Sequence, residues 1–371
     1  MNKLKNIGIS ALAGTLVSLS AAQAGGVSVT GAWELSYTNL NHSKVTGNKL
    51  GVKKNVGFGA SGDLSDGGGV TWATTVGMSD AFGLSSASMN INMGGIATLA
   101  YDSGTGGYGA NAVDNIVPTA WEEIDYGLST GITDLGAVSA SKGVVNLTIK
   151  SPGSGTGISL SYASRVGGSH QADGATGSDT GSNRGFDAVI DLVDVSEPQF
   201  GFRLGLAGEF TQKRVTCEGD NQIPVQSCNA GHKGHPYGLS AYTKFALGPL
   251  HVGTQATFKD PREAAEDGIR NKRSIVAGAA LVFGDTLSLS YGEAWDKYRY
   301  NNALRGDIAG TTGGSEEYAT IRYHGWSAAM NLGPVALKAT RNRVGGWGEN
   351  AGNTGRGIDK THSEVNLSIA F

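Results

Sequence analysis

The feature that most constrains this chain is an alternation of apolar and polar side chains that recurs along nearly all of it. A two-residue period places successive side chains on opposite faces of a β-strand, so each such run predicts a strand with one apolar face. Counting these runs between Gly25 and Phe371 predicts sixteen strands. The first run has Val27, Val29, Trp33, Leu35 and Tyr37 in one phase, with Ser28, Thr30, Glu34 and Ser36 in the other.

The connections between these runs divide by length. Seven are short and carry Gly, Pro, Asp or Ser, as at Gly248-Pro249 and Gly333-Pro334, and eight are longer and polar. Short turns at one end and longer loops at the other are typical of a transmembrane β-barrel, and about sixteen strands enclose a water-filled lumen. A soluble sandwich or solenoid requires no such alternation of lengths, and sixteen strands in one open sheet would leave two aggregation-prone edges. The sequence therefore predicts an all-β, 16-stranded antiparallel transmembrane β-barrel.

The first 24 residues have the pattern of an export signal. Lys3 and Lys5 precede an apolar stretch, and Ala22-Gln23-Ala24 fits a small-x-small cleavage site. Its removal would leave 371 − 24 = 347 residues with a net charge of −3 − 2 = −5, assigned to a single barrel domain, 25–371. No later apolar run reaches the length of about 18 residues that a membrane-spanning helix needs.

One stretch, Ile96 to Gly127, departs from the strand pattern. It begins as a short strand, breaks into a glycine-rich run, and has no lysine or arginine between Asp102 and Asp125. We expect it to fold back inside the barrel as a constriction loop and to narrow the channel. Anchoring of the loop by hydrogen bonds to the wall is an alternative role for each of its carboxylates. These candidate constriction residues are Asp102, Asp114, Glu122, Glu123 and Asp125.

Basic side chains mostly avoid the apolar phase, as expected if they face water, because one facing lipid at mid-depth costs roughly 2–4 kcal/mol. Lys54 is the exception, and we expect it near the outer rim. Between Tyr323 and Trp326 the apolar phase changes, which predicts a β-bulge near Gly325. His251, His324 and Lys259 are also expected on the lumen face. The candidate basic residues of the pore wall are Lys53, Lys142, Lys150, Arg203, Lys244, Arg322 and Lys338.

The two cysteines, Cys217 and Cys228, lie in one polar segment. In an oxidising compartment they predict a disulfide that pins a loop, and a metal site with His232 and His235 is a weaker alternative because the spacing matches no zinc pattern. A structural Ca²⁺ at the loop of Asp80 is a low-ranking expectation. No other cofactor is expected.

Taken together, the signal, the sixteen alternating runs, the acidic insertion after the fifth and the closing alternation that ends in Phe371 resemble a Gram-negative general porin. The stretch Val117 to Glu123 is similar to a "VPTAWEE"-like motif in the constriction loop of the alphaproteobacterial type. This resemblance implies a homotrimer in the outer membrane, surrounded by lipid and lipopolysaccharide. It implies that a segment near Ser79 to Ser85 latches onto a neighbouring subunit and that Phe371 acts as the signal read by the barrel-assembly machinery.

The resemblance also implies basic residues on the wall opposite the acidic loop, and here the chain departs from the family. Between Lys54 and Lys142 there is no lysine or arginine, whereas nine carboxylates occur. Carboxylates in a narrow channel with low-dielectric walls concentrate cations. We therefore expect a pore for ions and small hydrophilic solutes that leans towards cations.

Other functions have weaker support in the sequence. The seven histidines are scattered and accompany no serine elbow or HExxH motif, so an enzymatic barrel is not expected. No glycine-rich run has the Lys-Ser/Thr of a phosphate loop, and no nucleic-acid partner is expected. A substrate-selective channel is the alternative to general diffusion, but the aromatic residues near the constriction are too few for a slide. An adhesin would need longer outer loops.

Overall fold

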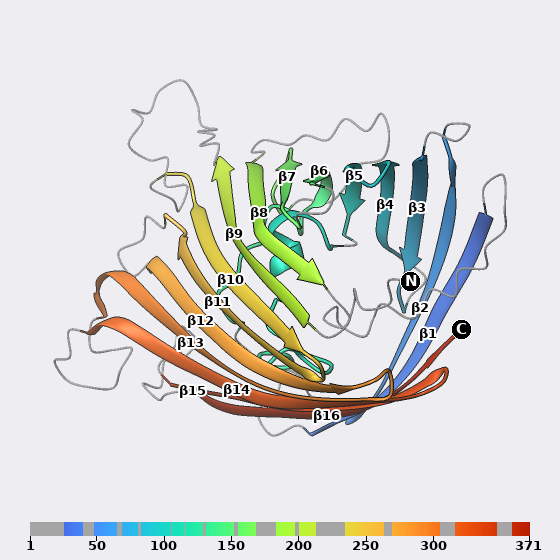
Figure 1. The fold of residues 1–371 in the computed structure, drawn as a ribbon. Coiled ribbons are helices and arrows are strands. Elements are labelled where there is room, and N and C mark those ends of the chain that lie inside the picture. The colour runs from blue at the N-terminus through green and yellow to red at the C-terminus, as the bar shows by residue number, and fades with distance from the viewer. Residues whose placement is uncertain are drawn as a thin grey trace, which may run out of the picture.

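In the computed structural model, sixteen antiparallel strands form one closed barrel (Figure 1). The predicted sixteen-stranded barrel is thus confirmed. The structure describes residues 26–39, 48–64, 69–80, 83–104, 106–114, 116–128, 131–151, 155–167, 183–196, 200–212, 234–262, 269–304, 316–346 and 358–371. The strands are β1 (Gly26–Asn39), β2 (Leu50–Asp63), β3 (Val70–Met78), β4 (Leu84–Met93), β5 (Ala97–Ser103), β6 (Lys142–Lys150), β7 (Gly157–Ala163), β8 (Arg184–Ser196), β9 (Phe200–Gln212), β10 (Tyr237–Leu247), β11 (Leu250–Asp260), β12 (Ile269–Phe283), β13 (Leu287–Leu304), β14 (Glu316–Leu332), β15 (Val335–Gly346) and β16 (Ile358–Ala370).

Each strand has an apolar outer face because of the two-residue period. In β10, Leu239 and Phe245 point outward and are exposed, whereas Ser240 and Tyr242 point inward and are buried. Ser240 and Thr257 of β11 share a hydrogen bond on the inner face at 3.1 Å. The apolar shell is therefore on the outside, and the inner face is mostly polar.

Closure joins the two ends of the chain. The N–H of Gly31 donates to the carbonyl of Phe371 at 2.8 Å, and the N–H of Phe371 donates to the carbonyl of Gly31 at 3.0 Å. The barrel end that holds this joint also holds the short turns, such as 248–249 and 333–334. The connection from β3 to β4 is short, and in it the N–H of Ser79 donates to the carbonyl of Gly83 at 3.2 Å.

The predicted bulge near Gly325 is wrong. β14 pairs with β13 and β15 in continuous register around this residue, from Leu332 up to Ile321. Arg322 therefore lies on the same outward face as Trp326, and the prediction that it lines the lumen is wrong. His324, expected in the lumen, also faces outward for this reason. The inward apolar residues of this strand instead contact another part of the chain, described below.

Some of the predicted features lie on residues that the structure does not describe. The export signal and both cysteines lie outside the described residues, so the predicted cleavage and disulfide remain predictions. Among the residues that are described, none forms a helix of the length and apolar character needed to cross a membrane. The only regular helix in this part of the chain is a short 3₁₀ turn, η1 (Gly109–Val113).

Candidate functional site

The chain between β5 and β6, residues 104–141, runs inside the barrel; we call it the inner segment. Its backbone is held by inward-pointing side chains of distant strands. The N–H of Ala120 donates to Ser290 Oγ of β13 at 2.8 Å, and the N–H of Trp121 donates to Ser327 Oγ of β14 at 3.2 Å. Asn342 Nδ2 of β15 donates to the carbonyl of Glu123 at 2.8 Å. The segment therefore crosses the lumen and lies against the opposite wall.

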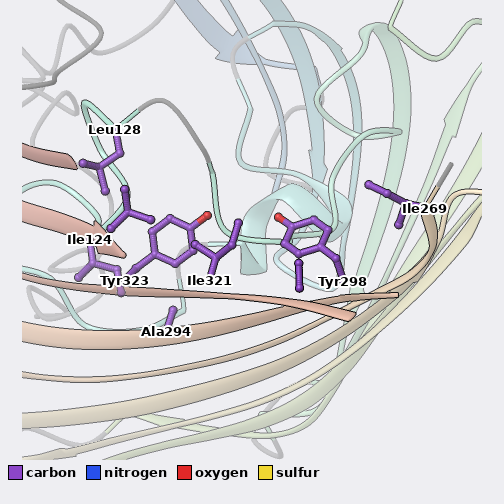
Figure 2. Close-up of a cluster of buried hydrophobic side chains, with 9 residues drawn as sticks. Ile124, Leu128, Ile269, Ala294, Tyr298, Ile321 and Tyr323 are labelled. Carbon is purple, nitrogen blue, oxygen red and sulfur yellow. The ribbon is translucent and has the colours of Figure 1, made fainter. Parts of the chain in front are cut away.

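An apolar seat inside the barrel receives the tip of the inner segment. Figure 2 shows Ile124 and Leu128 of the segment beside Tyr323 and Ile321 of β14. Burying a side chain of this size stabilises the docked state by about 1.5–3 kcal/mol. The seat explains why apolar residues of β14 face inward without a bulge: they contact protein rather than lipid. Its members are Ile124, Leu128, Ile269, Ala294, Tyr298, Ala319, Ile321, Tyr323 and Val344.

A second apolar contact holds the first part of the inner segment. Val113 of η1 and Ile116 are buried with Leu135, which belongs to the returning part of the segment. They pack on Val189 of β8 and Tyr242 of β10. Two apolar contacts on different sides of the barrel fix both parts of the segment, which gives it a defined position in the lumen.

Glycines on the inner wall let the segment approach closely. A Cβ on Gly253 of β11 would lie 2.7 Å from Pro118 Cδ, and one on Gly278 of β12 would lie 2.7 Å from a methyl group of Val117. These distances are shorter than side chains tolerate, so a larger residue at either position would push the segment inward. Close approach of backbones is an established reason for glycine within a strand.

Two acidic residues of the wall also anchor the segment. Asp296 of β13 accepts from the N–H of Thr133 at 2.7 Å and from its hydroxyl at 2.9 Å. Glu209 of β9 accepts from the N–H of Gly136 at 2.9 Å and forms an ion pair with Lys259 at 2.8 Å. Sequence reasoning missed both anchors. Their signal is an acidic residue in the inward phase of a strand, which by itself does not reveal the partner.

Four of the five predicted constriction residues come together. They border a cavity between the inner segment and β11 to β14. Asp134 also borders this cavity and was not among the predicted site residues. Thr133, Gln255 and Ser290 add neutral polar groups to its lining. The carboxylates on the cavity are Asp114, Glu122, Glu123, Asp125 and Asp134.

Asp102, the fifth predicted residue, is elsewhere. It is fully buried at the end of β5 and accepts from the N–H of Gly106 at 3.0 Å. The carboxylate thus fixes the turn through which the chain leaves the wall. This contact matches the anchoring alternative rather than a position on the cavity. Asp125 combines both roles, since its Oδ2 accepts from the N–H of Ile132 at 2.9 Å while it borders the cavity.

Burial and mutual repulsion raise the pKa values of the cavity carboxylates. Burial raises the pKa of Asp114 to about 8, with further contributions from Asp134 and Asp125. Burial likewise raises the pKa of Glu122 to about 7, reinforced by Glu364 of β16 and opposed by two lysines. The pKa of Glu123 is also well above its ordinary value, chiefly through burial. The negative charge of the cavity therefore grows as pH rises through neutrality.

The predicted basic residues do not form one cluster. Lys53 and Lys338 both act electrostatically on Glu122, and Lys338 Nζ lies 5.8 Å from the centre of the Trp121 ring. Arg203 Nε and Nη2 donate to Asp191 at 2.8 and 3.0 Å, a bidentate pair on the wall below the segment.

The remaining basic candidates have separate positions. Lys244 pairs in register with Arg203 on the neighbouring strand. Lys142 begins β6, where its side chain lies beside Gly104, and Lys150 is exposed at the other end of the same strand. Lys54 lies outside the lumen, as expected, and its N–H donates to Asp80 Oδ1. Near the acidic cavity, Lys53 and Lys338 act electrostatically on Glu122, and Lys259 of β11 acts on Asp114 and Asp134, its Nζ donating to the carbonyl of Asp134 at 3.3 Å.

Comparisons with known proteins give a fold but no family. No known family matches the sequence, and no curated protein matches it. Solved structures match nearly the whole chain. OmpT in trimer form, an outer membrane protein of Vibrio cholerae, has a TM-score of 0.59 at 10% identity, covering 94% of this chain and 100% of that chain.

Two further solved structures have the same fold. The outer membrane channel DcaP of Acinetobacter baumannii has a TM-score of 0.58 at 12% identity, covering 94% of this chain and 97% of that one. An anion-selective porin from Comamonas acidovorans has a TM-score of 0.54 at 12% identity, covering 94% and 100%. At such identities the likeness extends to the barrel architecture and not to individual site residues.

Proposed function

We propose that this chain is a general diffusion porin of a Gram-negative outer membrane, through which ions and small hydrophilic solutes pass without catalysis. The observation that carries the proposal is the closed barrel with carboxylates of the inner segment gathered on a cavity in its lumen. A closed barrel is the sheet that satisfies its backbone hydrogen bonds within lipid. Its apolar outer face and polar inner face suit lipid outside and water inside.

Cation preference follows from the charge of this constriction. Five carboxylates border the cavity, and three lysines of the described wall, Lys53, Lys259 and Lys338, act electrostatically on them. In a narrow passage with low-dielectric walls, this excess of negative charge raises the local concentration of cations. The passage would thus favour cations most when its carboxylates are ionised.

Homotrimeric assembly, insertion by the barrel-assembly machinery and contact with lipopolysaccharide are part of the same proposal. The trimer is supported by the resemblance to general porins and by the structure of the trimer form of OmpT. Native mass spectrometry of the detergent-extracted protein tests this part. A mass of three chains is expected, and a monomer would contradict the trimer without bearing on conduction.

The test of the transport proposal is the reversal potential of the reconstituted protein in asymmetric KCl. At about pH 9, above the raised pKa values of Asp114 and Glu122, wild-type protein should conduct with a reversal potential of the cation-selective sign, and Glu122→Gln/Glu123→Gln should move it towards zero. Asp63→Asn serves as a control, because this exposed carboxylate at the end of β2 is not part of the cavity lining. Absence of conductance would refute the pore, and an anion-selective sign would refute the cation preference. Conductance that saturates with one solute would favour the substrate-selective alternative.

A further inference from the structure

Charged residues on the outer face of the barrel are concentrated in one sector. Outward positions of β3 to β7, β9 and β10, as far as these strands are described, carry no Asp, Glu, Lys or Arg. Outward positions of β12 to β15 carry several, always towards the end opposite the short turns. We call five of the cationic members the outer basic patch: Arg273, Lys297, Arg322, Arg341 and Arg343.

Strand pairing brings the members of this patch together. Arg322 of β14 pairs with Trp295 of β13. Two residues further along β14, His324 pairs with Arg343 of β15. Arg341 pairs with Trp326 across the same two strands. Arg273 and Lys297 are register partners between β12 and β13. The cations thus form a continuous group across four adjacent strands.

One carboxylate tempers the charge of the patch. Glu293 Oε2 accepts from Arg322 Nη2 at 2.8 Å, and its other oxygen accepts from the hydroxyl of Tyr291 at 2.7 Å. The five cations of the patch against Glu293 give 5 − 1 = +4, and Arg299, in the same outward phase of β13, is a further cation of this sector. The guanidinium of Arg322 remains 57% exposed and offers more N–H donors than Glu293 uses.

Aromatic side chains lie at the same level as the patch. Trp295, Trp326 and Tyr291 are each at least 40% exposed on the outward face, and Arg322 lies 5.6 Å from the centre of the Trp295 ring. Trp and Tyr mark the interface between lipid and water in membrane proteins. Directly below them, Leu289 and Leu337 continue the apolar face towards the short turns. The patch therefore lies where headgroups meet acyl chains, on the side of the longer loops.

We propose that the outer basic patch binds the phosphate groups of an anionic lipid in the leaflet on the long-loop side. This inference rests on the proposed membrane location, and it adds a specific lipid site to it. Arginine forms bidentate hydrogen bonds with phosphate, which suits Arg322, Arg341 and Arg343. The apolar surface below the patch receives acyl chains of the same molecule, so charge and apolar complementarity act together. A soluble anion would use only the charge complementarity and not the apolar surface.

The test compares lipid binding by native mass spectrometry on full-length, detergent-extracted protein. The probes are bisphosphorylated lipid A, the same glycolipid without phosphates, and phosphatidylcholine. Wild-type protein should retain bisphosphorylated lipid A in preference to both others. Arg322→Gln/Arg341→Gln/Arg343→Gln should bind it on the order of 100-fold more weakly, since each cation near an anionic surface contributes about a fivefold factor.

A matched control and a second readout separate this inference from the pore. Lys54→Gln/Arg184→Gln removes two outward cations of β2 and β8 that lie outside the patch, and it should bind lipid A as wild type does. Equal retention by the triple variant, or equal binding of the dephosphorylated glycolipid, would overturn the proposal. A triple variant that changes its oligomeric state but not its lipid binding would assign the patch to contact between copies. The conductance of the triple variant should match that of wild type. Absence of conductance in wild type and in every variant would instead refute the proposed function.

Discussion

Among single residues, the cavity carboxylates matter most because their neutral and charged forms are close in free energy near neutral pH. The pKa of Glu122 is raised to about 7 and that of Asp114 to about 8. A carboxyl group with a raised pKa is neutral below it and charged above it. The electrostatic field of the passage is therefore set by the pH of the medium and not only by the sequence.

This titration predicts a pH-dependent selectivity. The permeability ratio of K⁺ to Cl⁻ should rise from about pH 6 to about pH 9, because ordinary carboxyl groups have already ionised below this range. Glu122→Gln should remove the lower part of the rise and leave the part due to Asp114. Reversal potentials measured across the range check both expectations. A ratio that stays constant, or falls with pH, would contradict the raised pKa values.

A wall anchor gives a second prediction for a single residue. Asp296→Ala removes the acceptor for the N–H and hydroxyl of Thr133, and a buried donor left without a partner costs about 1–3 kcal/mol. Amide hydrogen exchange of Thr133 should accelerate strongly while strand amides of β1 stay protected. Asp285→Ala, at a short turn, is the control and should leave the exchange of Thr133 unchanged. Unaltered protection in Asp296→Ala would mean that the apolar seat alone holds the segment.

For the individual elements, the strands and most turns followed from the sequence, whereas the seat of the inner segment did not. Alternation identifies a strand because its period is a property of the backbone. It does not distinguish an apolar residue facing lipid from one facing protein, which is why Tyr323 and Trp326 suggested a bulge. The anchors Asp296 and Glu209 escaped for a similar reason, since their partners are backbone groups far away in the chain.

The contact between the inner segment and the wall gives a prediction for this element. Gly253→Ala places a methyl group against Pro118, and overpacking of this kind costs typically 1–3 kcal/mol. We expect a folded barrel whose single-channel conductance differs from wild type, because the segment is displaced. Gly157→Ala in β7 meets only ordinary contacts and should conduct as wild type does. Identical conductance for both variants would show that the segment does not limit the current.

At the scale of the whole molecule, the last residue has two separable roles. Phe371 closes the barrel through its hydrogen bonds with Gly31, and the resemblance to porins assigns it a role in insertion. Deleting Phe371 removes only two hydrogen bonds at the end of the β1–β16 pairing, which continues from Ala32 and Ala370 to Asn39 and Ser363, so refolding into detergent should still yield the heat-modifiable band of a barrel on gels. In cells, the amount of assembled protein should fall much further. An equal loss in both assays would mean that closure, and not recognition, is what the deletion damages.

The apolar seat has a consequence for a barrel from which the inner segment is missing. Water would then contact the apolar residues of the seat, such as Ile321, Tyr323 and Val344. The lumen would contain an apolar patch on an otherwise polar inner face. Such a barrel should bind solvatochromic dyes that the intact protein does not bind, and hydrophobic antibiotics would bind to the same apolar surface. The inner segment thus also covers an apolar surface in the lumen. Its loss would make the barrel permeable to hydrophobic compounds.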